Sequence, residues 1–146
     1  MKRAEALQPL SRDHHPALEV ALKLRRATDR DADAVRREFL EVWREHGALH
    51  FRVEEDVLLP AAAHRVDPSD PAVVRVLTDH IEIRRRASDL EGSEEPVPGD
   101  LNTLGEALND HVRHEERVLF PMIDEALSEE ELSRLVQCVE ETERTG

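Results

Sequence analysis

A segment of eleven residues that occurs twice most constrains how this chain can fold. Residues 50–60 read HFRVEEDVLLP and residues 111–121 read HVRHEERVLFP, with seven of the eleven positions identical. Any two amphipathic helices would share hydrophobic positions, but a histidine and two acids repeated in register are harder to obtain from helix formation alone. Residues four apart lie on one face of a helix, so His50 points with Glu54, and His111 with Glu115. An imidazole beside a carboxylate is a metal-ligand pair.

Length and composition favour one soluble domain, spanning residues 1–146. The net charge of −13 argues against nucleic acid and anionic membranes as partners. The single cysteine, Cys138, excludes an intramolecular disulfide and suits a reducing compartment. No apolar run approaches the ~18 residues of a membrane span. We therefore expect a cytoplasmic protein that is a monomer or a weak homo-oligomer.

Helical periodicity and turn residues predict an all-α fold without strands. The simplest arrangement is an up-down-up-down four-helix bundle with a short C-terminal extra helix. Residues 1–12 are expected to be a loose lead-in, with Asp13 as an N-cap, and Ser128 should open the last helix through a capping box. Pro60 and Pro121 are expected to kink their helices. The predicted helices cover about 13–28, 34–64, 71–91, 100–126 and 129–142, the first four forming the bundle at about 13–126.

A height calculation gathers four histidines into one layer of this bundle. In an antiparallel helix pair, two residues lie at the same height when the turn is midway between them. The midpoints of consecutive pairs among His14, His50, His80 and His111 fall at 32, at 65 and between 95 and 96, inside or beside the three predicted turns. Glu54 and Glu115 then lie one helical turn, about 5.4 Å, to the same side of the layer.

Four imidazoles and two carboxylates inside an apolar bundle predict a metal site. One ion with six ligands is conceivable, but carboxylates on diagonally opposed helices are well placed to bridge two ions. By chain neighbourhood, His14 and His50 would then hold one ion, and His80 and His111 the other. Mixed nitrogen and oxygen ligands suit iron, manganese or zinc, and the lack of thiolate argues against copper(I). We favour two iron ions, because an open ferrous pair can give electrons to a diatomic ligand.

Several neighbouring residues offer alternatives. His14 is preferred to the adjacent His15, because Asp13-His14 matches Asp79-His80 and Asp110-His111. His46, one turn before His50, is either a further ligand or, as we prefer, a neighbour of the ligands or a solvated group.

The remaining polar residues of the motif are expected to lie away from the ions. His114 is interpreted as a neighbour of the ligands or a surface residue. Glu55 and Glu116 point about 100° away from the ligand carboxylates, which predicts ion pairs on the bundle surface.

These residues resemble the hemerythrin-like (HHE cation-binding) domain family. The resemblance rests on His14, His80 and the doubled His-x-x-x-Glu motif, with its endings at Pro60 and Pro121, and it covers about residues 10–126. It implies a helical bundle around an oxo- or hydroxo-bridged diiron centre. Oxygen-carrying members have a fifth histidine one turn after the third-helix histidine, where this chain has Arg84. This difference favours the four-histidine branch over a reversible oxygen carrier.

The function expected from the resemblance is binding or sensing of O2 or a related small oxidant, with O2 or NO as the ligand. A binding module without catalytic residues is the first hypothesis. The alternatives are redox turnover of peroxide or nitric oxide at the same centre, and iron delivery or iron homeostasis.

Overall fold

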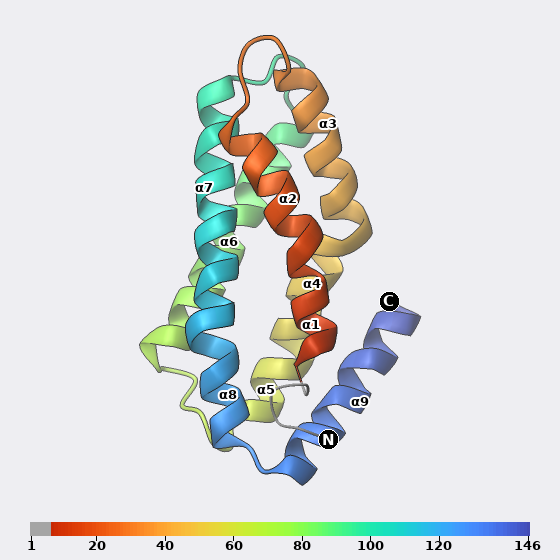
Figure 1. Cartoon of the computed structure of the whole chain (residues 1–146), viewed down its shortest axis with the longest axis vertical. Helices are drawn as coiled ribbons and strands as arrows, with labels where there is room; N and C mark the ends of the chain where they lie inside the picture. The colour runs from red at the N-terminus through yellow and green to blue at the C-terminus, as the bar shows by residue number, and fades with distance from the viewer. Residues whose placement is uncertain (1–6) are drawn as a thin grey trace.

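The computed structural model describes residues 7–146, and within that range the chain contains helices and turns but no strand. The all-α prediction is therefore confirmed. Figure 1 shows an elongated helical bundle in which consecutive long helices are joined at alternate ends of the molecule, as the height calculation requires.

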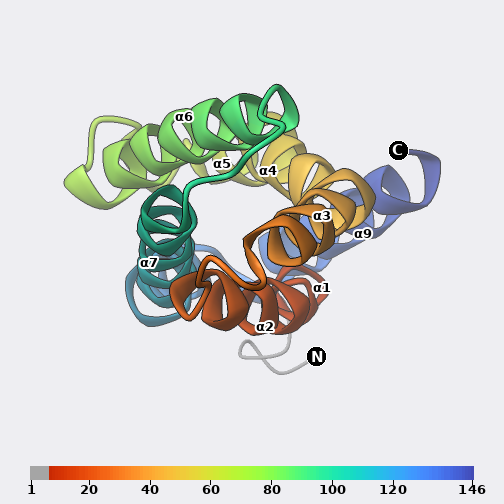
Figure 2. The ribbon, with the colours of Figure 1, turned by 90° about the horizontal axis from the view of Figure 1, so that it is seen from above.

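Four bundle helices surround a common axis, and a fifth helix lies outside them (Figure 2). The first bundle helix comprises α1 (Gln8–Arg12) and α2 (His14–Arg25), and the third is α6 (Pro71–Glu91). The second comprises α3 (Ala32–Val42), the π-helical turn η2 (Trp43–Gly47), α4 (Ala48–Val53), the π-helical turn η3 (Glu54–Leu58) and α5 (Leu59–Ala62). The fourth comprises α7 (Pro98–His114), the π-helical turn η4 (Glu115–Leu119) and α8 (Phe120–Ala126). The outer helix α9 (Glu129–Thr145) packs against α1, α4 and η3.

Near the N-terminus, one prediction was wrong and another was confirmed only in part. The expected lead-in, as far as it falls within the described residues, contains helix α1, because Leu7 and Leu10 are buried in an apolar cluster with residues of α9. Asp13 lies at the N-cap position of α2, as predicted, but it has helical backbone angles and its carboxylate makes no capping bond. It accepts instead from His50 Nδ1 at 2.9 Å. The part of the lead-in at residues 1–6 lies outside the described residues.

Pro60 and Pro121 do not end their helices. Each follows a π-helical turn, η3 or η4, in which the backbone N–H of the residue after the turn bonds to the carbonyl of Glu54 or Glu115, five residues earlier. A π turn suits these sites because proline lacks the N–H that a regular helix needs. The two carboxylates of the repeated motif thus begin the two widened turns.

The other helix ends follow simple capping chemistry. Asp70 accepts from the backbone N–H of Ala72 at the start of α6, and Pro71 occupies the first turn. Ser128 and Glu131 form the predicted capping box of α9, although this helix has 17 residues and is not short. Helix α6 has the predicted bounds.

Close packing of α2 against α7 fixes the height of the first bundle helix. A Cβ atom on Gly105 would lie 2.8 Å from the Ala21 carbonyl oxygen, so only glycine permits this approach. Asn102 Nδ2 donates to the carbonyl oxygens of Leu24 and Arg25 at 2.9 and 3.1 Å, which ties the end of α2 to α7.

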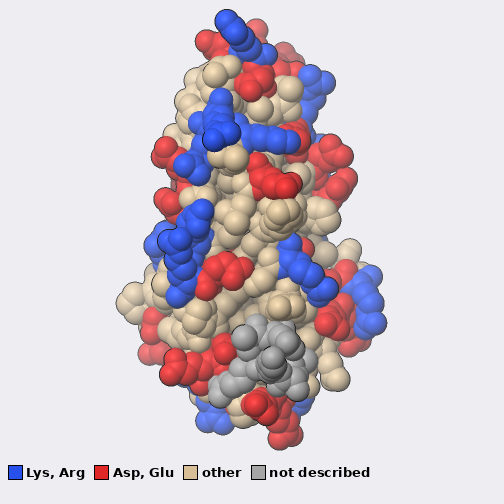
Figure 3. Space-filling model, viewed as in Figure 1, with Lys and Arg blue, Asp and Glu red and all other residues tan. Residues whose placement is uncertain are grey.

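Two apolar clusters fill the bundle and leave a polar layer between them. One contains residues of α2, α3, α6 and α7, including Phe39, Ile83 and Leu104. The other, at the end of the bundle that α9 covers, includes Leu58 and Leu119. Basic and acidic side chains are interspersed over the face shown in Figure 3. Among residues 7–146, no helix combines the length and the apolar composition needed to cross a bilayer.

Candidate metal centre

Six polar side chains meet in the layer between the two apolar clusters. All are buried, with exposed fractions of at most 6%; they are His14, His50, Glu54, His80, His111 and Glu115. Their ligand atoms form two groups of four, each with all atoms within 4.8 Å of one another. One group contains His14 and His50, the other contains His80 and His111, and both share Glu54 and Glu115. The structure thus brings together all six predicted side chains, in the predicted histidine pairs.

A carboxylate from a neighbouring bundle helix binds Nδ1 of every one of these histidines. His50 Nδ1 donates to Asp13 at 2.9 Å, and His111 Nδ1 donates to Asp79 at 2.9 Å. Nδ1 of His14 and His80 lies 2.7 Å from Glu116 and 2.6 Å from Glu55, respectively. These bonds place the proton on Nδ1 and direct the Nε2 lone pair toward the centre, as in metal-ligating histidines generally.

The centre contains buried polar atoms without a hydrogen-bond partner among the described residues. They are His50 Nε2, His111 Nε2, Glu54 Oε2 and Glu115 Oε2. His50 Nε2 lies 3.3 Å from Glu54 Oε2, and His111 Nε2 lies 3.6 Å from Glu115 Oε1. An unsatisfied buried polar atom is unfavourable by about 1–3 kcal/mol. Several of these unsatisfied atoms face one another, and cations bound between them would satisfy them.

Electrostatics in the layer also favour a cation. Burial, reinforced by the charge of Glu115, raises the pKa of Glu54 well above its ordinary value, since two carboxylates in one dry site repel each other. Burial lowers the pKa of His80 to about 4, so this imidazole is neutral at pH 7. Burial alone would lower the pKa of His50 too, but Glu54 and Asp13 outweigh it and raise the pKa. A cation would replace the protons that hold this layer together.

The neighbouring histidines lie outside this cluster. His15 is exposed and pairs with Glu19, so the structure places His14, not His15, in the layer. The side chain of His46 is 50% exposed. His114 Nε2 bonds to the carbonyl oxygen of Ala72 at 3.0 Å.

Sequence reasoning missed the carboxylates that orient the histidine rings. Glu55 and Glu116 were expected to form surface ion pairs, and Glu55 does pair with the partly exposed Arg84. Both acids also bind a histidine of the layer, His80 and His14 respectively, because the direction 100° from the ligands faces a neighbouring helix as well as water. Arg84 stands where oxygen carriers have a histidine, and its Nη1 donates to Glu55 at 2.7 Å instead of entering the layer. The signal in the sequence was that Glu55 and Glu116 repeat beside the predicted ligands Glu54 and Glu115.

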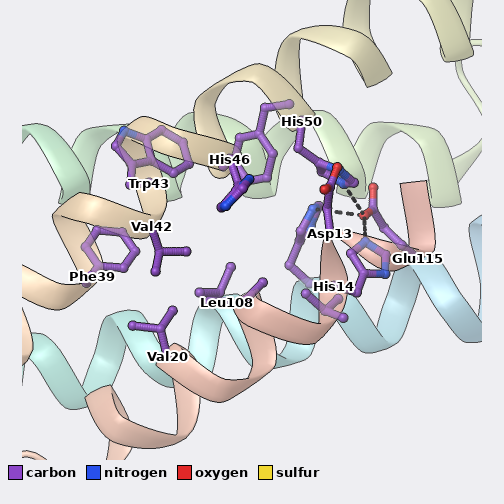
Figure 4. Close-up of a pocket in the computed structure, with 15 residues that line it drawn as sticks. Asp13, His14, Val20, Phe39, Val42, Trp43, His46, His50, Leu108 and Glu115 are labelled. Carbon is purple, nitrogen blue, oxygen red and sulfur yellow. Dashed lines mark hydrogen bonds and ion pairs between the residues drawn. The ribbon is translucent and has the colours of Figure 1, made fainter. Parts of the chain in front are cut away.

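A small apolar cavity reaches the centre from one side. Its volume is about 40 Å³, and its walls include Val20, Phe39, Val42, Trp43 and Leu108. Figure 4 shows Val20, Phe39, Val42 and Trp43 toward one end and His14, His50 and Glu115 at the other, with His46 and Leu108 between them. Neither His80 nor Glu54 lines the cavity. Since one water needs about 10–15 Å³ of such volume, the space suits a diatomic molecule or a few waters.

Comparison with known proteins identifies one family. The sequence model of the family described as hemerythrin HHE cation binding domain matches residues 6–123. No curated protein and no solved structure matches the chain. The matched segment contains all six side chains of the centre and ends before α9.

Proposed function

Because the chain belongs to the hemerythrin HHE cation-binding domain family, we propose that it binds a pair of iron ions and, through them, binds or senses O2 or a related small oxidant. The ligands are the six side chains of the buried layer. His14 and His50 hold one ion, His80 and His111 hold the other, and Glu54 and Glu115 serve both.

The observation that carries this proposal is the set of unsatisfied atoms at the centre. Two imidazole nitrogens and two carboxylate oxygens are buried without a hydrogen-bond partner among residues 7–146, and they lie in the two overlapping ligand groups. Each group offers two nitrogen and two carboxylate ligands, a donor set that suits iron, manganese or zinc. When bound, an iron pair supplies electrons and open coordination positions for a diatomic ligand. The chain orients the four imidazoles through the carboxylates at their Nδ1 atoms and keeps bulk water away.

The cavity supports a small, weakly polar ligand. Its wall combines His14, His50 and Glu115 with apolar side chains, so an uncharged diatomic molecule can approach that end of the centre without losing strong hydration. A substrate much larger than a few waters does not fit a space of about 40 Å³, and the apolar wall disfavours a charged one. This geometry favours O2 or nitric oxide over metabolites.

Variants at the carboxylates test the iron-binding part. We expect Glu54→Ala and Glu115→Ala to lower the iron content of protein reconstituted with ferrous iron under nitrogen, because each removes a ligand shared by both groups. His46→Ala and Glu106→Ala, which change residues outside the layer, are the matched controls. Equal iron content in all four variants would contradict the proposal.

Turnover assays separate the enzymatic alternative. Addition of peroxide or nitric oxide to the iron-loaded protein should give at most stoichiometric reaction if the protein binds or senses its ligand. Sustained catalysis would instead favour a redox enzyme. Rapid loss of ferrous iron to a chelator would favour iron delivery.

A further inference from the structure

The two histidine pairs have equivalent ligands but different surroundings. Each histidine donates from Nδ1 to a carboxylate: Glu55 and Asp79 serve His80 and His111, whereas Glu116 and Asp13 serve His14 and His50. The difference lies one contact further out, in the groups that touch these four carboxylates.

Two arginines of α6 touch the carboxylates of the His80–His111 pair. Arg84 Nη1 lies 2.7 Å from Glu55 Oε2, the oxygen that accepts from His80. Arg75 Nε lies 3.6 Å from Asp79 Oδ2, the oxygen that accepts from His111. The Arg84 guanidinium also lies 5.7 Å from the ring centre of Phe51, which stacks on His80 at 3.8 Å.

Among the described residues, no arginine makes such a contact with the carboxylates of the His14–His50 pair. Glu116 lies beside the Ser11 side chain of α1, and Asp13 lies beside the carboxyl group of Glu143 of α9. Burial, together with the charge of Asp13, raises the pKa of Glu143. Within residues 7–146, neither Asp13 nor Glu116 has a lysine or arginine within ion-pair distance. The charge of Arg12 acts on Glu143 and lowers its pKa, against the larger effect of burial.

From this asymmetry we infer that the two ion positions are unequal, with the His14–His50 position binding its cation more tightly than the His80–His111 position. The inference rests on the proposed metal binding. An arginine-paired carboxylate is a weaker acceptor, so it draws less proton density from the imidazole and leaves Nε2 a poorer donor. The arginine charge also opposes the cation directly. Ser11 and Glu143 add no positive charge on the other side, and Glu143 lies outside the family match.

Zinc titration of the metal-free full chain, followed by calorimetry, tests the inference. We expect two binding steps. Arg84→Gln and Arg75→Gln should each tighten the weaker step about three- to tenfold, an effect kept small by solvent because both side chains are partly exposed. Arg84→Lys should leave that step unchanged. Arg85→Gln, on the same helix but paired with Glu82 and Asp89, is the matched control.

A variant of Glu143 tests the His14–His50 position. Glu143→Gln should weaken the tighter step, while Glu140→Gln, exposed on the same helix, should not. The effects of the arginine variants should shrink as the salt concentration rises from 0.05 M to 0.5 M, because screening acts on charge and not on packing.

The outcomes are distinguishable. Weaker zinc binding in Arg84→Gln would mean that the arginine only holds Glu55 in place, and would overturn the inference. Two binding steps with the same affinities in the unmodified chain and in all of the charge variants would overturn the inference as well. Absence of any zinc binding in the unmodified protein would contradict the proposed function itself.

Discussion

Each histidine of the layer is fixed by a specific carboxylate partner. Asp13 and Asp79, which precede His14 and His80 in the chain, bind the histidine of the next bundle helix. The acids after the ligand glutamates, Glu55 and Glu116, bind the remaining two rings. The duplication seen in the sequence therefore extends to the groups that orient the ligands.

Loss of one such carboxylate should weaken metal binding. We expect Asp79→Ala to lower the affinity for zinc or ferrous iron about 10- to 100-fold, because His111 loses the acceptor that sets its tautomer and orientation. Competition with a chelator of known affinity measures the change. Asp110→Ala, at an exposed position of α7, is the control. Equal affinities of the two variants would show that Asp79 has no such role.

Metal binding should release protons. The pKa values of His50 and Glu54 are raised in the metal-free layer, so these groups retain protons that solvated groups would lose, and a cation must displace them. The affinity should therefore rise with pH and fall as these groups become protonated. Calorimetry in buffers of different ionisation enthalpy gives the number of protons. An affinity independent of pH between 6 and 8 would contradict this prediction.

The meeting of six polar side chains in one layer could be predicted from sequence, whereas the carboxylates that orient the histidine rings could not. Turn positions alone place His14, His50, His80 and His111 at one height. Whether Glu55 faces water or His80 depends on how far each helix is rotated against its neighbour, and no local pattern contains that rotation. Arg84 illustrates the same limit: its position on α6 was clear, but not its partner.

At the scale of elements, the approach of α2 to α7 sets the register that brings His14 level with His111. Gly105 allows the approach, and Asn102 bonds to the end of α2. The register of these two helices decides whether His14 reaches Glu115 Oε1, which lies 2.9 Å from its Nε2.

We expect Gly105→Ala to destabilise the fold by about 1–3 kcal/mol, because the new methyl group would overlap the backbone of α2. Gly99→Ala, in the first turn of the same helix, has open space around it and should change stability by less than about 1 kcal/mol. Urea unfolding of the metal-free proteins gives both free energies. A Gly105→Ala variant as stable as the unmodified chain would mean that the helices separate at no cost.

The elements were predictable where local chemistry defines their ends. Asp70, Pro71 and Gly92 bracket α6, and its predicted bounds agree with the structure. Helix α1 was missed because its stability comes from burying Leu10 against a cluster that includes residues of α9, more than a hundred residues away. The π-helical turns were not predicted either, although Pro60 and Pro121 follow two of them, η3 and η4.

At the scale of the molecule, a charged layer separates two apolar clusters, so the metal-free fold contains unfavourable buried groups. Saturating metal should raise the thermal midpoint: free metal at 100 times the dissociation constant contributes about 2.7 kcal/mol if the unfolded chain does not bind it. Scanning calorimetry with zinc or a chelator measures the shift. The double variant His50→Ala/His111→Ala should lose it, and an unchanged shift in that variant would place the metal elsewhere.

Two ions in one buried layer are the central claim, and the metal content of the whole protein tests it most directly. Protein purified and reconstituted with ferrous iron under nitrogen should contain two iron ions per chain and should develop a new near-ultraviolet absorption band when exposed to air. A single zinc or iron ion per chain, with no spectral change in air, would contradict the claim.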